Sequence, residues 1–157
     1  MNEVIIKNKL MKFALKEAEK ALKMDEVPIG SVIVKDNKII GRGYNQVESL
    51  VDSTAHAEII AITSAANYLG DWRLNDCSIY ITKEPCLMCY GAILNSRIVN
   101  VIYGFSDSDK GFRVRLNKEL ILYRTHLKNI EGNVLLLDCK MLVEDFFKSK
   151  RKKNKNS

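Results

Sequence analysis

Residues 78 to 95 read SIYITKEPCLMCYGAILN, and this stretch joins a predicted strand to a predicted helix. Its first part, Ser78–Thr82, is rich in β-branched residues, which favour strands. Pro85 interrupts this pattern, and proline is tolerated at or just before a helix start because the N–H group that it lacks would have no partner there. The sequence therefore predicts a helix from Cys86 to about Asn95, with two cysteines in its first turn.

A second helix is predicted to begin in a similar way, directly after a loop. Its first residues are Thr54-Ala55-His56-Ala57-Glu58, and the helical pattern extends from Ala55 to Tyr68. Gly70 lies just beyond it, where glycine commonly ends a helix. A start near Ala55 places His56 and Glu58 where side chains can point past the helix terminus.

The remaining elements complete an alternation of strands and helices. Apolar residues at helical spacing predict an amphipathic helix over residues 8–24. The runs 31–34 and 39–44 flank a polar turn and predict a β-hairpin. Further along we expect strands at 98–103 and 134–137, a loop at 105–115, a short helix at 116–124 and a last helix at 138–150. This order predicts a three-layer α/β/α domain around a mixed, five-stranded sheet.

The composition indicates an ordinary globular protein. The 157 residues suffice for one domain with a core, and the chain is 46% hydrophobic and 28% charged. No apolar run approaches the roughly 20 residues that cross a bilayer, and the N-terminus lacks the apolar region of a signal peptide. We therefore expect a cytoplasmic protein without a membrane segment.

The net charge of +6 is concentrated at the C-terminus. Six of the 25 Lys and Arg residues lie in the last ten positions, so the other 19 balance the 19 acidic residues. We expect a single domain over residues 1–147 and a disordered basic tail over residues 148–157. Such a tail is typical either of a solvated terminus or of a segment that attracts a polyanion such as nucleic acid.

The cysteine spacing predicts a metal site. In a cytoplasmic chain a disulfide framework is not expected, and a close pair such as Cys86 and Cys89 is typical of metal binding or redox chemistry. Residues three apart share a helix face, and the free N–H groups of a first turn favour thiolates. With His56 they make three protein ligands, which suits a catalytic zinc ion that keeps its fourth position open to water. The other candidate ligands are Cys77, Cys139 and His126, and Cys77 lies roughly 30 Å from Cys86 along an extended strand.

Glu58 is the predicted catalytic residue. A zinc ion with two thiolates is formally neutral and activates water less strongly than an all-histidine site would. A carboxylate that accepts the water proton compensates for this, and it can then deliver protons to a ring nitrogen and to a departing amine. The pattern H-x-E followed by P-C-x-x-C therefore predicts hydrolytic deamination of an aminopurine or aminopyrimidine.

Beyond these two motifs, the chain resembles the bacterial tRNA-specific adenosine deaminase family, one of the cytidine-deaminase-like enzymes. The resemblance covers about residues 10–147. The zinc motifs are shared by all cytidine-deaminase-like enzymes, whereas two other motifs, Glu26–Gly30 and Ser96–Ile98, resemble the tRNA-specific branch in particular. The matching stretches are Glu26-Val27-Pro28-Ile29-Gly30, Gly43-Tyr44-Asn45, Thr54-Ala55-His56-Ala57-Glu58, Glu84-Pro85-Cys86-Leu87-Met88-Cys89, Ser96-Arg97-Ile98, Tyr103-Gly104 with Asp107, and Asp145-Phe146-Phe147.

The resemblance implies a cytidine-deaminase-like fold and a specific reaction. The family converts the wobble adenosine of a tRNA anticodon stem-loop to inosine, as a homodimer with one zinc ion per subunit. Carried over by position, Asn45 contacts the flipped nucleotide, and Asp107 lies in a loop beside the nucleic-acid backbone. From the residues alone, Asn45 is better explained as a turn former at a strand end and Asp107 as a solvated loop acid, and only the resemblance favours the substrate contacts.

Some residues depart from the family pattern, and other functions stay open. Gly111-Phe112-Arg113-Val114-Arg115 replaces a loop of small residues, and Val47 and Ser53 stand where proline is common. One alternative is a small-molecule deaminase that acts on guanine, cytosine or a nucleoside. Another is a non-catalytic RNA-binding protein with a structural zinc ion, although such a site has no use for Glu58.

Overall fold

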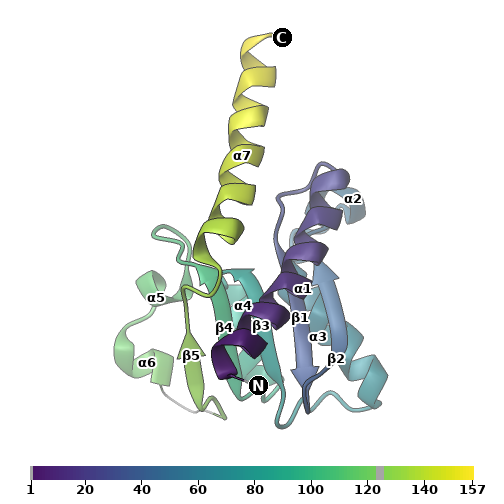
Figure 1. Ribbon diagram of the computed structural model, residues 1–157, viewed down its shortest axis with the longest axis vertical. Coiled ribbons are helices and arrows are strands. Elements are labelled where there is room, and N and C mark those ends of the chain that lie inside the picture. The colour runs from purple at the N-terminus through teal and green to yellow at the C-terminus, as the bar shows by residue number, and fades with distance from the viewer. Residues whose placement is uncertain (1, 123–125) are drawn as a thin grey trace.

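The computed structural model describes residues 2–122 and 126–157, and a five-stranded sheet lies at its centre (Figure 1). The strands are β1 Gly30–Lys35, β2 Lys38–Tyr44, β3 Ser78–Lys83, β4 Asn100–Phe105 and β5 Asn129–Glu131, in the order β2-β1-β3-β4-β5. Strand β1 is antiparallel to β2 and β3, whereas β3, β4 and β5 run parallel. The predicted mixed sheet and hairpin are confirmed.

Helices cover both faces of this sheet, which confirms the three-layer α/β/α arrangement. Helices α1 (Glu3–Lys23) and α7 (Leu136–Lys155) pack on one face, in front in Figure 1. Helix α3 (Ala57–Leu69) packs on the other face, where it contacts α4 (Leu87–Asn95). Three short helices lie in the connections: α2 Val47–Leu50, α5 Phe112–Arg115 and α6 Lys118–Leu122.

The core consists of two apolar layers, because neighbouring residues of a strand point to opposite faces. On β1, Ile33 belongs to the layer beneath α3 and α4, and Val32 belongs to the layer beneath α1 and α7. Strand β4 divides in the same way, with Val101 in the first layer and Ile102 in the second. No helix among the described residues combines the length and the apolar character that crossing a bilayer requires.

The prediction of a last strand at 134–137 is wrong. The fifth strand is Asn129–Glu131, which pairs in parallel with β4, and Leu136 already begins helix α7. Leu135 precedes that helix in a left-handed conformation with φ of 52°. The apolar run is the first part of a helical pattern, in which Cys139, Val143 and Phe146 turn inward.

Gly104 lies within β4, although the strand predicted at 98–103 stops one residue before it. A Cβ atom at this position would lie 2.3 Å from the Thr82 carbonyl oxygen and 2.5 Å from the sulfur of Cys139. Glycine is needed here because α7 approaches the sheet closely, and the chain does not turn until after Phe105.

Two further segments differ from the predictions. Residues 148–155, expected to be disordered, continue α7 to Lys155, and this part of the helix projects from the body of the molecule in Figure 1. The helix predicted at 116–124 is observed as α6, which is described to Leu122, and residues 123 and 124 lie outside the described residues.

Candidate active site

The two sequence motifs meet where helices α3 and α4 begin. His56 is the residue before α3 and Cys86 the residue before α4, both in extended backbone conformations. Neither side chain caps its own helix, so each is free to point away from the helix axis. The helices were predicted to begin at Ala55 and Cys86, one or two residues early. On an ideal helix the side chains of His56 and Glu58, two residues apart, would point in different directions. Because the backbone at His56 is extended, both side chains can reach the same site.

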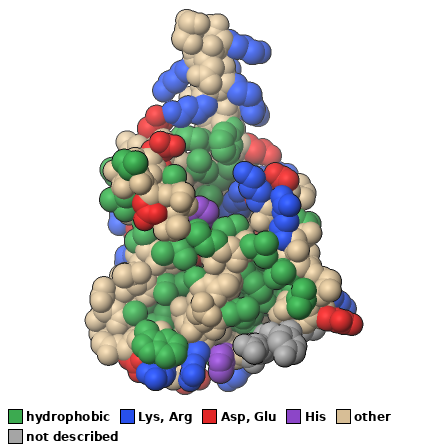
Figure 2. All heavy atoms as spheres, turned by 180° about the vertical axis from the view of Figure 1, so that it is seen from behind, with side chains coloured by type: hydrophobic (Ala, Val, Ile, Leu, Met, Phe, Trp, Pro, Cys, Tyr) green, Lys and Arg blue, Asp and Glu red, His purple; other side chains and the backbone are tan. Residues whose placement is uncertain are grey.

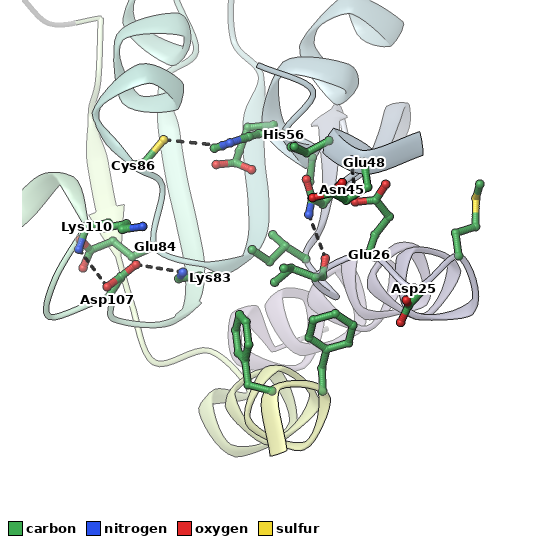
Figure 3. A pocket seen from close by; sticks show the side chains of 18 of the residues that line it. Asp25, Glu26, Asn45, Glu48, His56, Lys83, Glu84, Cys86, Asp107 and Lys110 are labelled. Carbon is green, nitrogen blue, oxygen red and sulfur yellow. Dashed lines mark hydrogen bonds and ion pairs between the residues drawn. The ribbon is translucent and has the colours of Figure 1, made fainter. Parts of the chain in front are cut away.

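Three side chains converge to a geometry that fits a metal ion. The Nδ1 atom of His56 lies 3.7 Å from the sulfur of Cys86 and 3.5 Å from the sulfur of Cys89. Figure 3 shows the first of these contacts. In tetrahedral coordination with Zn–S of about 2.3 Å and Zn–N of about 2.0 Å, sulfur and nitrogen lie about 3.5 Å apart. Within residues 2–122 and 126–157, these three form the one group of metal-ligating side chains that is close enough to hold an ion.

The electrostatics of this cluster favour a thiolate. The pKa of Cys86 is lowered to about 3, first because the Cys89 thiol hydrogen-bonds to its sulfur and then because His56 does. The pKa of His56 is raised, chiefly by the same hydrogen bond to Cys86. Both shifts favour a negative sulfur next to a positive charge, and a bound cation would supply that positive charge.

Glu58 lies in the first turn of α3, next to the cluster. Its side chain is only 4% exposed, and burial raises the pKa of its carboxyl group. Contact with Cys89 works against this rise in the pKa, so Glu58 lies beside the three clustered side chains. A buried carboxyl with a raised pKa takes up and holds a proton more readily than an exposed one, as a proton shuttle requires.

His56, Glu58 and Cys86 line a cavity of about 690 Å³. Its walls come from the segment before β1, the segment after β2, the starts of α3 and α4, the end of β3, the loop after β4, and helix α7. Asn45, a predicted substrate contact, lies in this wall and is buried. Its side-chain amide donates to the carbonyl of Val27 at 3.3 Å, and its backbone N–H donates to Ile29 (Figure 3).

Asp107, the second predicted substrate contact, lines the same cavity from the loop after β4. Its carboxylate accepts from the backbone N–H groups of Asp109 and Lys110, each at 3.0 Å, and from the Lys83 ammonium at 2.9 Å. Burial by itself would raise the pKa of Asp107, but these partners outweigh it and lower the pKa to about 2. Asp107 is thus a firmly held anion and not a freely solvated loop acid.

Sequence reasoning missed two cavity residues with defined partners, Glu26 and Lys83. Glu26 is 1% exposed, and its carboxylate accepts hydrogen bonds from the Glu48 and Ser49 backbones and from the Ser49 hydroxyl, which holds α2 against the cavity. Lys83 is the last residue of β3 and reaches Asp107. The sequence did offer a signal for Lys83, because it comes directly after the predicted strand and before Pro85-Cys86. Ligands bind beyond the carboxyl ends of parallel strands, so a charged residue there is a candidate for the site.

The unusual loop 111–115 does not enter the cavity. Phe112 is fully buried and stacks on Tyr90, with ring centroids 4.3 Å apart. The three residues that follow it, Arg113, Val114 and Arg115, are exposed. The remaining candidate ligands lie apart from the cluster: Cys77 and Cys139 are buried in the core, and His126 is exposed.

Three side chains placed to hold a metal ion and a buried carboxyl at two helix starts, on a mixed α/β/α sheet, define the class of the cytidine-deaminase-like enzymes. The family model of the MafB19-like deaminases matches residues 5–151 of the chain. A tRNA-specific adenosine deaminase of Streptococcus pyogenes is 43% identical, over 94% of this chain and 93% of that protein. The chain belongs to the family of the tRNA-specific adenosine deaminases.

Two solved structures agree with this placement. One comes from work on A-to-I editing by tRNA:A34 deaminases at the wobble position of transfer RNA; it is 36% identical, has a TM-score of 0.78, and the match covers 85% of this chain and 98% of that one. The other is guanine deaminase from Bacillus subtilis, which is 40% identical with a TM-score of 0.62, over 69% of this chain and 68% of that one.

Proposed function

We propose that the protein hydrolyses adenosine to inosine at the wobble position of tRNA. The observation that carries this proposal is the convergence of His56, Cys86 and Cys89 beside the buried carboxyl of Glu58. The names of its relatives supply the substrate, since they are tRNA-specific adenosine deaminases. A tRNA substrate also implies a cytoplasmic location, which we include in the proposal.

The metal that we propose is zinc, one ion per subunit, held by Nδ1 of His56 and the sulfurs of Cys86 and Cys89. When bound, zinc lowers the pKa of a water molecule and so supplies a nucleophile at neutral pH. Two sulfurs and one imidazole are a donor set that zinc favours, and three ligands are the number of a catalytic site. Metal analysis of the purified protein should find about one zinc per chain and much less in Cys89→Ser. A stoichiometric metal other than zinc would contradict the assignment.

Glu58 moves the protons in this proposal. It takes one proton from the attacking water and delivers it to the ring nitrogen N1 of adenine, and the second proton of that water passes to the departing amine. One water is consumed and ammonia is released. The buried position of Glu58 and its raised pKa suit it to hold a proton between these two transfers.

We propose that Asn45 contacts the flipped adenosine and that Asp107 lies beside the RNA backbone. Both residues line the cavity that holds the catalytic group, and both are fixed by hydrogen bonds to their own neighbourhood. A target base in a single-stranded loop is cheap to extrude into such a cavity.

The direct test is mass spectrometry of nucleosides from an anticodon stem-loop incubated with the zinc-loaded protein. We expect inosine at the wobble position only. Absence of inosine, together with turnover of a free base, would reject tRNA editing.

A second candidate is deamination of a free base, because the guanine deaminase from Bacillus subtilis is 40% identical. This enzyme class needs no contact with a nucleic-acid backbone. Assays of ammonia release with guanine, cytosine and adenine separate the two functions, and we expect turnover of each free base to be far below that of the stem-loop.

We also propose a homodimer, in which the interface is the outer surface of the α3 and α4 layer. Leu87 and Met88, at the start of α4, are 44% and 37% exposed. The view of the back of the molecule in Figure 2 shows hydrophobic side chains spread across this side. An apolar surface beside the catalytic cavity would let the second subunit complete the binding site.

A further inference from the structure

Lys83 places a positive charge on the inner wall of the cavity. It is the last residue of β3, two positions before Pro85, and its side chain is 26% exposed. Figure 3 shows its ammonium group between Asp107 and the opposite wall of the cavity.

Asp107 holds this ammonium in place. The carboxylate is itself fixed by two backbone N–H groups and lies 2.9 Å from Nζ of Lys83. A lysine ammonium has three N–H donors. Contact with Asp107 uses one of them, so Lys83 can bind a second anion without giving up the first.

The charges around the cavity make such a cation necessary for a polyanionic substrate. The acidic residues in its lining outnumber the lysines, and they are Asp25, Glu26, Glu48, Glu58, Glu84 and Asp107. Of the lining lysines, Lys150 pairs with Asp25, and Lys110 is exposed at the rim. Lys83 is the least exposed of the three, and at this depth its interaction with an anion is less screened by salt.

We propose that Lys83 binds a phosphate of the RNA adjacent to the flipped adenosine, while Asp107 positions its ammonium. This inference rests on the proposed function, since it requires an RNA substrate. Adenine is neutral and offers the ammonium no charge, whereas the nucleotide that enters the cavity brings a phosphate on each side. Lys83 thereby favours a nucleotide within a strand over a free base.

The test is a double-mutant cycle in which each protein variant is combined with each substrate variant. Wild type, Lys83→Met and Lys83→Arg are assayed for kcat/KM on a synthetic stem-loop and on stem-loops whose phosphate 5′ or 3′ of the target carries an uncharged methylphosphonate. Lys38→Met is the matched control, because Lys38 is exposed at the β1–β2 turn, at the other end of these strands from the cavity.

At one of the two linkages, wild type should lose roughly ten-fold or more in kcat/KM, as for a charge-assisted hydrogen bond. Lys83→Met should lose a similar factor in kcat/KM on the natural stem-loop. Its kcat/KM should fall no further when that linkage carries the methylphosphonate, because the effects of removing two directly interacting groups are not additive. The slope of log kcat/KM against log salt should fall by about 0.7, the value for one phosphate of a single strand. Lys83→Arg should recover most of the activity, and Lys38→Met should behave as wild type.

Additive losses at both linkages, or a Lys83→Met variant with wild-type kcat/KM and salt slope, would overturn the proposal. A folded Lys83→Met protein with normal zinc content but without recovery in Lys83→Arg would assign Lys83 a structural role only. If wild type produced no inosine on the natural stem-loop, the proposed function itself would fail, and the proposal for Lys83 with it.

Discussion

His56 and Cys86 reach each other because each is the residue before a helix and not part of one. Their extended backbones turn the side chains away from the helix axes and toward the cavity. Cys89 and Glu58, each inside the first turn of its helix, then complete the cluster. The two sulfur-to-nitrogen distances, 3.5 and 3.7 Å, are within a few tenths of an ångström of the value for a tetrahedral zinc site. A metal ion could therefore bind with little movement of these side chains.

Replacing Glu58 with Gln should abolish turnover without removing the metal. The amide cannot accept the water proton, and general acid–base groups contribute about 10²- to 10⁴-fold in rate. The measurements are kcat for inosine formation and zinc content, with the exposed Glu19→Gln as control. An active Glu58→Gln enzyme would remove Glu58 from the mechanism. Loss of activity with zinc retained would exclude a purely structural zinc protein.

The acidity of Asp107 should depend on Lys83. A lowered pKa means that the partners of the carboxylate, first the backbone N–H of Lys110 and then Lys83, stabilise the folded state above the unfolded-state pKa of 3.8. This contribution disappears as the pH falls through about 2. Lys83→Met removes one partner of the carboxylate, so the pKa of Asp107 should rise toward 3.8. NMR titration of the side-chain carboxyl carbon measures both values, and an unchanged pKa would show that the backbone N–H groups alone hold the anion.

At the scale of elements, the close approach of α7 to the sheet depends on Gly104. Gly104→Ala should lower the free energy of unfolding by about 2 kcal/mol, because its Cβ would overlap backbone and Cys139 atoms that cannot easily move. Urea unfolding at neutral pH measures the change. Gly91→Ala is the control, since a Cβ there meets no atom within 4 Å and alanine favours the helix. Equal stabilities of the two variants would show that α7 can shift away at little cost.

The elements that the sequence predicted correctly have strong local patterns, and the ones that it misplaced do not. Helix α3 ends as expected at Gly70, which is left-handed with φ of 66°. Strand β5 is only three residues long and is defined by its pairing with β4, a contact with a segment far away in sequence. The leucine run at 134–137 is apolar enough for a strand, and only packing of the later turns of α7 shows that it is helical.

At the scale of the whole molecule, the basic end of α7 should strengthen binding of RNA. Arg151, Lys152, Lys153 and Lys155 are exposed on the projecting part of the helix. Their replacement by Gln, a residue of similar helix propensity, removes four charges and leaves the Lys150–Asp25 ion pair intact. The KM for tRNA should rise and its salt dependence should weaken, with kcat unchanged, in steady-state assays at several salt concentrations. An unaltered KM would show that this part of α7 is only a solvated terminus.

The proposed homodimer predicts a solution mass of twice 17.9 kDa in sedimentation equilibrium. Met88→Lys places a charge in the apolar surface of α4 and should shift the protein toward monomer. Leu137→Lys is the control, because Leu137 is 68% exposed on α7, which packs on the other face of the sheet. A monomeric wild type would reject the dimer.

The sequence by itself determined the α/β/α class, and it predicted that His56, Cys86 and Cys89 form a metal site with Glu58 beside it; the structure brings these side chains together. These features are encoded locally. The periodicity of apolar residues predicts the helices and strands, and the spacing of His56 and Glu58, and of Cys86 and Cys89, within two short motifs predicts the chemistry. Only the tertiary structure decided that Lys83 and Asp107 meet in the cavity. Lys83 comes from the end of β3 and Asp107 from the loop after the parallel strand β4, and no local pattern encodes which distant charges a folded sheet brings within 3 Å.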